Sequence, residues 1–160
     1  MKHASEEGTK VRNIVVVPHS HWDREWYSTF QQFRFYLVQF IDELIDLLER
    51  DSEFRHFLLD GQMILIEDYL EIRPENKERL YRLIREGRIR IGPWYVQPDE
   101  FLVSGEALVR NLLIGDRLAR RIGEPMKQGY VPDTFGHISQ LPQILNGFGI
   151  HTFYFMRGFG

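Results

Sequence analysis

The sequence has no cysteine among its 160 residues. This absence excludes a disulfide framework and leaves only nitrogen and oxygen ligands for any bound metal. No apolar run is long enough to cross a bilayer, and residues 1–10 contain no apolar core of a secretory signal. The formal net charge is -3 at pH 7, so the chain lacks the basic excess that suits nucleic acid. We therefore expect a cytoplasmic protein without nucleic-acid or membrane partners.

One segment concentrates the chemically versatile residues of the chain. It follows the short β-branched run Ile14–Val17 and reads His-Ser-His-Trp-Asp-Arg-Glu-Trp from His19 to Trp26. The apolar run lacks alternation, which predicts a strand over residues 13–18 that is buried on both faces, as in parallel sheets. Imidazole and carboxylate groups suit zinc or a similar divalent ion, and an indole suits the apolar face of a sugar. The segment therefore predicts a metal and a ligand in one pocket.

Strands and helices alternate along the rest of the chain. Apolar spacing and capping residues predict helices over residues 27–50, 63–71, 74–87 and 104–122 and a short helix that ends at residue 147. Further strands are predicted over residues 57–59, 89–96, 129–131 and 151–156. This order predicts an α/β fold with a parallel sheet covered by helices. We expect one domain over residues 13–160, preceded by a frayed tail over residues 1–12.

Polar or aromatic side chains follow every predicted strand. They are His19, His21 and Asp23 after the first strand, Asp60 after the second, Trp94, Tyr95 and Asp99 after the third, Asp133 and Phe135 after the fourth, and Arg157 after the fifth. Active sites of α/β barrels and open sheets lie at this carboxyl edge. We therefore expect these side chains to share a pocket. A helix N-cap is an equally good explanation of Asp60 and is also open for Asp133.

Two segments of the chain resemble the signatures of a known family. His19–Trp26 resembles the first signature of the glycoside hydrolase family 38 α-mannosidases, and Gly129–His137 resembles the second. Leu59–Gln62 and Ile91–Tyr95 are similar to segments of the bacterial branch of this family. The resemblance extends over nearly the whole chain. It implies a zinc-dependent retaining hydrolase of α-mannosides on a seven-stranded parallel β/α barrel, of which this chain would form the first five βα units.

The resemblance also implies the roles of individual residues at the metal. His21 and Asp23 match two zinc ligands, and Asp133 matches both a third ligand and the catalytic nucleophile. His19 lies in the same motif, where we expect it to support His21 or the strand end. Cobalt and manganese remain alternatives to zinc, since the available ligands are nitrogen and oxygen.

Four further residues are assigned to the substrate. Trp26 and Phe135 match aromatic residues around the sugar, and Arg157 takes the place of an arginine beside the nucleophile. An adjacent cation stabilises a negatively charged carboxylate. Asp60 completes the predicted substrate-binding set. The expected substrate is a mannose-containing oligosaccharide or another mannoside, and mannosylglycerate and glycan linkages both remain open.

The chain also departs from the family pattern. A fourth zinc ligand and an acid/base carboxylate have no matched position, and neither His137 nor His151 fits the missing ligand. We therefore expect an N-terminal portion of a catalytic domain that is inactive alone and whose open strand edges favour self-association. Two alternatives remain, a metal-dependent amidohydrolase or deacetylase and a non-catalytic domain that binds sugar or metal. The aromatic residues near Asp133 favour sugar cleavage over the first of these.

Overall fold

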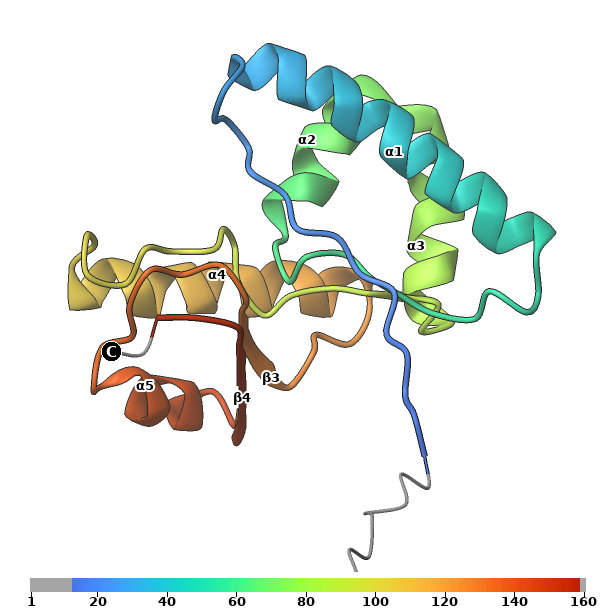
Figure 1. Ribbon diagram of the computed structural model, residues 1–160. Coiled ribbons are helices and arrows are strands. Elements are labelled where there is room, and N and C mark those ends of the chain that lie inside the picture. Colours follow the sequence, from blue (N-terminus) through green and yellow to red (C-terminus); the bar gives the residue numbers. More distant parts are fainter. Residues whose placement is uncertain (1–12, 159–160) are drawn as a thin grey trace, which may run out of the picture.

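Helices and short parallel strands alternate along residues 13–158, which are the residues that the computed structural model describes (Figure 1). The elements are α1 (Phe30–Arg50), β1 (Phe57–Leu58), α2 (Ile64–Ile72), the 3₁₀ helix η1 (Pro74–Asn76), α3 (Lys77–Arg85), β2 (Ile89–Arg90), α4 (Gly105–Ile122), β3 (Gln128–Val131), α5 (Leu141–Gly147) and β4 (Thr152–Phe155). The predicted α/β order is confirmed. Within the described range, no helix combines the length and the apolar character that crossing a membrane requires. The tail predicted over residues 1–12 lies outside that range.

The strands follow one another in chain order. β1 pairs with β2 and β3 pairs with β4, both in parallel. Single parallel bridges join His19 to Leu58 of β1 and Ile91, just after β2, to Pro125, just before β3. In the part of the chain that the structure describes, the strand order therefore does not reverse midway as it does in a dinucleotide-binding fold. This order agrees with the predicted parallel sheet, whereas closure of a seven-stranded barrel stays a prediction.

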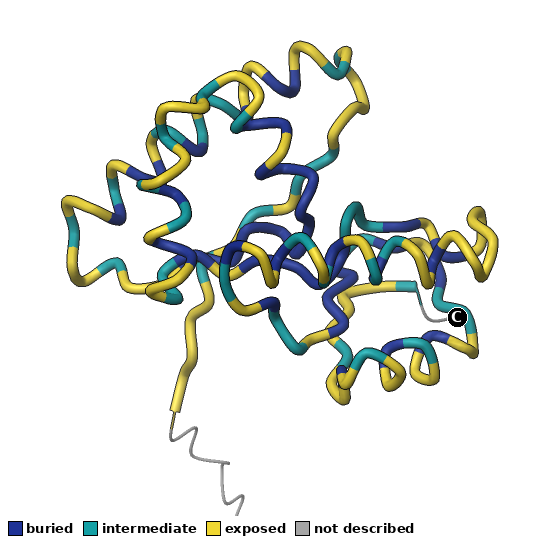
Figure 2. The backbone as a smooth tube through the Cα atoms, turned by 180° about the vertical axis from the view of Figure 1, so that it is seen from behind, coloured by how far each residue is buried: buried dark blue, intermediate teal, exposed yellow. Residues whose placement is uncertain are grey.

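The predicted first strand is wrong in both its extent and its burial. Residues 13–18 form no strand, and the side chains of Ile14, Val15 and Val16 are exposed by 83%, 83% and 82% (Figure 2). Ladder-type hydrogen bonds occur only at its end, where the Leu58 amide donates to the Pro18 carbonyl at 3.0 Å. The predicted strand does not form because it has no partner strand of matching length. β1 contains only two residues, so it is too short to pair with the whole apolar run.

The predicted third strand is shorter than expected. β2 covers Ile89–Arg90 instead of residues 89–96. Gly92 has a φ of 65°, which turns the backbone out of the extended conformation, and Pro93 has no amide hydrogen for a ladder. The chain beyond this turn buries Trp94, whose indole Nε1 donates to the Tyr130 carbonyl of β3 at 2.9 Å. The broken strand thus attaches the loop after β2 to the neighbouring strand.

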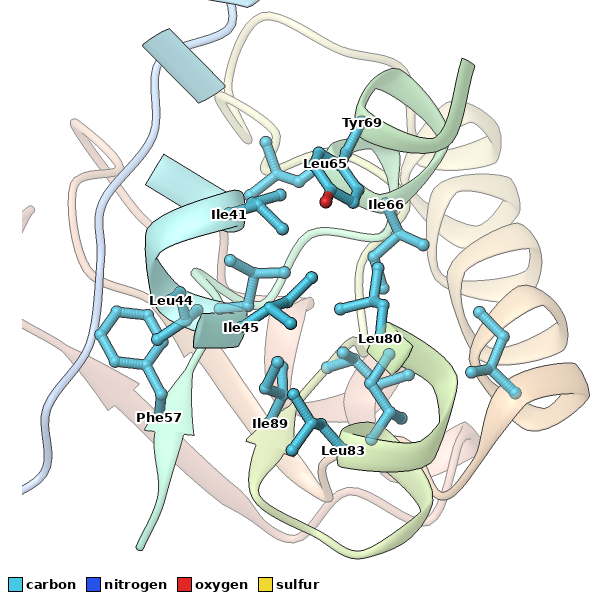
Figure 3. Packing of buried hydrophobic residues seen from close by; sticks show 14 of the residues in the cluster. Ile41, Leu44, Ile45, Phe57, Leu65, Ile66, Tyr69, Leu80, Leu83 and Ile89 are labelled. Carbon is cyan, nitrogen blue, oxygen red and sulfur yellow. The ribbon is translucent and has the colours of Figure 1, made fainter. Parts of the chain in front are cut away.

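Two apolar cores hold the strands and helices. The larger core packs α1, α2 and α3 against β1 and β2, and Figure 3 shows part of it. Its members in α1 are Leu37, Ile41, Leu44, Ile45 and Leu48, which have the helical spacing seen in the sequence. The smaller core joins Trp94 and α4 to β3 and α5. Because the cores fix the strands, they also fix the loops at the carboxyl ends of the strands.

Candidate metal centre

The three predicted metal ligands lie close together. His21 and Asp23 lie on the segment that passes the end of β1, and Asp133 follows β3 by two residues. One ligand atom from each lies within 4.8 Å of the other two. The Nε2 atom of His21 is 3.4 Å from Asp133 Oδ2 and 3.6 Å from Asp23 Oδ1. A tetrahedral zinc ion with bonds of about 2.0–2.2 Å separates its ligand atoms by roughly 3.3–3.6 Å. The two distances from His21 therefore fit such an ion, and binding itself stays a prediction.

The three side chains are partly open to solvent. The exposed fractions are 33% for His21, 41% for Asp23 and 30% for Asp133. Structural zinc sites are closed by four protein ligands, whereas catalytic sites keep one position for water or substrate. The open face of this cluster therefore suits a catalytic ion more than a structural one.

Arg157 and Phe135 lie beside Asp133. The Arg157 Nη2 atom forms an ion pair with Asp133 Oδ1, and its Nε donates to the Asp133 carbonyl at 3.3 Å. The guanidinium lies 4.0 Å from the centre of the Phe135 ring. The two oxygens of the Asp133 carboxylate thus face different partners, one facing His21 and the other facing Arg157. The exposed Trp26 ring packs on Tyr27, with ring centres 5.4 Å apart.

Asp60 has a different place from the one predicted. Its side chain is 0% exposed, so it offers no surface to a sugar. The N-cap of α2 is Met63, with no side-chain cap, which also excludes the N-cap explanation. The Asp60 Oδ1 atom instead lies 3.4 Å from Nδ1 of His21. The carboxylate therefore lies behind His21, and the assignment of Asp60 to substrate binding stays a prediction that this burial does not support.

The charges around His21 favour a cation. The hydrogen bond with Asp60 raises the pKa of His21; burial opposes that rise, and the charges of Asp60, Asp23 and Asp133 add to it. Burial raises the pKa of Asp60, and hydrogen bonds from His21 and Gln62 reduce that rise. Three carboxylates around one imidazole leave an excess of negative charge, which a proton or a metal ion would reduce.

His19 was expected to support either His21 or the strand end, and its contacts are with two strands. Its Nδ1 atom lies 3.0 Å from the Tyr130 hydroxyl of β3. Burial raises the pKa of Tyr130 to about 12, so this phenol is neutral at physiological pH. His19 therefore links the segment before the metal cluster to β1 and β3, which agrees with support of the strand end rather than of His21.

Four residues around the centre were missed by sequence reasoning. They are Gln62, Gln97, Glu100 and His137. Gln62 and His137 lie inside motifs that had been recognised, so their positions carried a signal. Gln97 and Glu100 lie in the loop between β2 and α4, and no pattern in the sequence pointed to them. Both act through contacts with residues distant in the chain, which a sequence pattern does not encode.

Comparison with known proteins identifies the family. Residues 11–159 match the model of the glycosyl hydrolases family 38 N-terminal domain. The chain belongs to glycosyl hydrolase family 38. The sequence resemblance is thereby confirmed over nearly the same residues that suggested it.

Relatives within family 38 are much longer than this chain. It is 49% identical over 144 residues to a Halalkalibacterium halodurans protein named "Putative mannosylglycerate hydrolase", covering 89% of this chain and 16% of that protein. It is 31% identical over 151 residues to human "Alpha-mannosidase 2", covering 92% of this chain and 13% of the relative. The crystal structure of an alpha-mannosidase from Enterococcus faecalis V583 superimposes with a TM-score of 0.86 at 44% identity, covering 87% of this chain and 16% of that one. This likeness supports the α/β fold of the family 38 N-terminal domain.

Proposed function

We propose that this chain carries the nucleophile and three metal ligands of a retaining α-mannosidase. The observation that carries the proposal is the position of Asp133, whose carboxylate faces His21 with one oxygen and Arg157 with the other. Membership in family 38 and the names of the relatives support an α-mannoside as substrate. Family membership also argues against the alternative of an amidohydrolase or deacetylase.

In the proposed reaction Asp133 acts as the nucleophile. One of its oxygens bonds to the anomeric carbon while the glycosidic C–O bond breaks, and an acid carboxyl protonates the leaving oxygen. Water then hydrolyses the glycosyl ester and regenerates Asp133. Arg157 aligns the nucleophile through its ion pair. We assign the acid carboxyl to no residue of this chain.

The ligand set limits the ions that the centre would hold. His21, Asp23 and Asp133 would bind zinc, with cobalt and manganese as alternatives for a nitrogen and oxygen set. A bound divalent ion would polarise substrate oxygens and stabilise the charge that develops in the transition state. Phe135, which is 72% exposed beside Asp133, offers an apolar surface to the sugar, and we propose the exposed Trp26 as a second one.

We also propose that residues 13–160 form the N-terminal portion of the catalytic domain. In this proposal the segment at His19 and the strands β1, β2, β3 and β4 belong to the first five βα units of a seven-stranded barrel. Their order along the chain, without reversal in the described residues, supports this arrangement. The substrate class includes small mannosides, since the relative with 49% identity is named for mannosylglycerate.

The test measures hydrolysis by the whole protein, which includes any residues outside the 160 of this chain. Wild type, Asp133→Asn and His19→Ala are assayed with an aryl α-mannoside and with mannosylglycerate, and their metal content is determined. We expect Asp133→Asn to lower kcat by about 10³-fold or more, since an amide is a poor nucleophile, and to retain less metal. His19→Ala is expected to be milder, because His19 contacts Tyr130.

Two outcomes would contradict this proposal. Near-normal kcat in Asp133→Asn would remove the nucleophile role from Asp133. A wild-type protein that binds metal and mannosides but hydrolyses neither substrate would support the alternative of a binding domain. Circular dichroism on all three proteins shows whether each variant keeps its fold.

A further inference from the structure

We propose that Asp60 is a positioning residue that fixes the orientation and tautomer of His21, so that Nε2 faces Asp23 and Asp133. This inference rests on the metal centre of the proposed function. The two nitrogens of the His21 ring face different carboxylates. Nδ1 is 3.4 Å from Asp60 Oδ1, whereas Nε2 is 3.4 Å from Asp133 Oδ2 and 3.6 Å from Asp23 Oδ1. The imidazole therefore has one nitrogen on the buried side and the other on the side of the predicted ion.

Hydrogen bonds hold the Asp60 carboxylate in one orientation. Oδ2 accepts from the Trp22 amide at 2.7 Å and from Nε2 of Gln62 at 2.6 Å. The Gln62 side chain is itself fixed, since it donates to the Trp22 carbonyl at 2.9 Å and accepts from the Gln97 amide at 3.0 Å. The Gln97 side chain donates to the Asp60 carbonyl at 2.7 Å. Oδ2 thus has two short hydrogen bonds, whereas Oδ1 has only a long one from Gln97 Nε2 at 3.4 Å and can also accept from Nδ1 of His21.

The backbone and burial of Asp60 are both unfavourable on their own. It is fully buried, and a buried carboxylate needs compensating partners. Its φ is 42°, and no other non-glycine residue in the described part of the chain has a positive φ. Non-glycine residues in this region carry strain that concentrates at functional sites. Both features are explained if the carboxylate is needed at Nδ1 of His21.

A histidine that binds a metal through Nε2 needs a hydrogen-bond acceptor at Nδ1. A neutral imidazole carries its proton on one nitrogen and a lone pair on the other. An acceptor at Nδ1 keeps the proton there and leaves the Nε2 lone pair for a metal, and such carboxylate–histidine pairs strengthen metal binding. A merely structural Asp60 would join the loop after β1 to the Trp22 amide without affecting the tautomer of His21.

The substitution Asp60→Asn separates these two roles. Asparagine is nearly the same size and tolerates positive φ better than most residues, so the loop keeps its conformation. Its oxygen still accepts hydrogen bonds, but the negative charge at Nδ1 is lost. We expect zinc affinity to fall about 10–100-fold, as for other partners of metal ligands. The matched control is Asp42→Asn in α1, where the carboxylate accepts from Tyr69 and Arg73 instead of a metal ligand. Its zinc affinity should equal that of wild type.

The experiment combines metal titration with nitrogen NMR on the whole protein. Zinc and cobalt affinities are measured by calorimetry against a competing chelator. The ¹⁵N shifts of His21, in metal-free protein at a pH where the ring is neutral, report its tautomer. We expect protonated Nδ1 in wild type and in Asp42→Asn, and a shift towards protonated Nε2 in Asp60→Asn.

The outcomes distinguish this inference from the proposed function. Wild-type zinc binding with unchanged affinity in Asp60→Asn would overturn the role of Asp60 and leave the metal centre standing. Absence of zinc and cobalt binding in wild type would overturn the metal centre. The NMR shifts need no metal and still decide on Asp60 in that case. Protonated Nε2 in wild-type His21 would overturn the inference even if Asp60→Asn failed to fold.

Discussion

At the scale of single residues, one buried polar cluster joins three loops next to the candidate site. His137 Nδ1 lies 2.9 Å from Glu100 Oε1, and its Nε2 lies 2.8 Å from the Arg157 carbonyl. The Glu100 carboxylate also accepts from the Ile138 amide at 2.8 Å. The side chains of His137 and Glu100 are 6% and 0% exposed. The loops after β2, β3 and β4 are thus tied together at the backbone of the arginine that holds Asp133.

We predict that His137→Ala lowers the free energy of unfolding by about 1–3 kcal/mol, because Glu100 loses a partner in a place that water does not reach. His137→Gln should lose less, since its amide can still donate to the carboxylate. Urea denaturation of both variants gives these values. The control is His151→Ala, an exposed histidine that should change the free energy of unfolding by no more than about 0.5 kcal/mol. Equal stability of His137→Ala and His151→Ala would contradict the prediction.

The sequence predicted which residues meet at the metal better than which way they face. His21, Asp23 and Asp133 were expected together because parallel strands bring their carboxyl ends to one edge. Asp60 follows β1 at the same edge, yet it is buried behind His21. The position of Asp60 just after β1 was predicted correctly. The side chain of Gln97, from the loop after β2, donates to the Asp60 carbonyl, and no local pattern predicts that contact.

At the scale of elements, α4 packs directly on the backbone of the loop after β2. A Cβ atom at Gly115 would lie 2.3 Å from the Pro93 carbonyl oxygen and 2.4 Å from the Trp94 carbonyl carbon. One turn earlier, Asn111 Oδ1 accepts from the Tyr95 amide at 2.9 Å, and its Nδ2 donates to the Val96 carbonyl at 2.6 Å. The helix therefore holds the loop that leads to the Asp60 cluster.

We predict that Gly115→Ala destabilises the fold by about 1–3 kcal/mol, since the methyl group forces helix and loop apart. Gly105→Ala on the same helix is the matched control, because nothing lies within 4 Å of its added methyl group. That variant should be neutral or more stable by about 0.4–1 kcal/mol. Thermal and urea unfolding of both variants provide the comparison. Equal stability of the two would show that the loop after β2 yields to the methyl group.

Helices were predicted more accurately than strands, for a physical reason. Helix hydrogen bonds are local, so spacing and caps suffice, as with Ser104, whose Oγ accepts from the Ala107 amide at 3.2 Å. The main error for α1 was a start at residue 27 instead of Phe30. The length of a parallel strand depends on the partner beside it. For this reason residues 13–18 and 89–96 were predicted as longer strands than the structure contains.

At the scale of the whole molecule, two exposed apolar segments border one cavity. The first is Ile14–Val17, and the second is Tyr154–Met156 at the end of β4. The cavity has a volume of about 810 Å³, and Val15, Val17 and Tyr154 contribute to its lining. Apolar surfaces of this kind mark places where proteins associate, and unpaired strand edges add free backbone donors and acceptors.

We predict that the 160-residue chain self-associates through this surface. In sedimentation velocity over a range of concentrations, the wild-type mass should rise above the monomer value of 19.1 kDa. The double variant Val15→Lys and Val16→Lys should remain at that value, because charge on an exposed edge opposes pairing while the side chains take no part in either core. Ile72→Lys, at the half-exposed end of α2, is the matched control and should associate like wild type. A wild-type chain that stays monomeric at every concentration would contradict the prediction, and equal association of all three proteins would assign it to another surface.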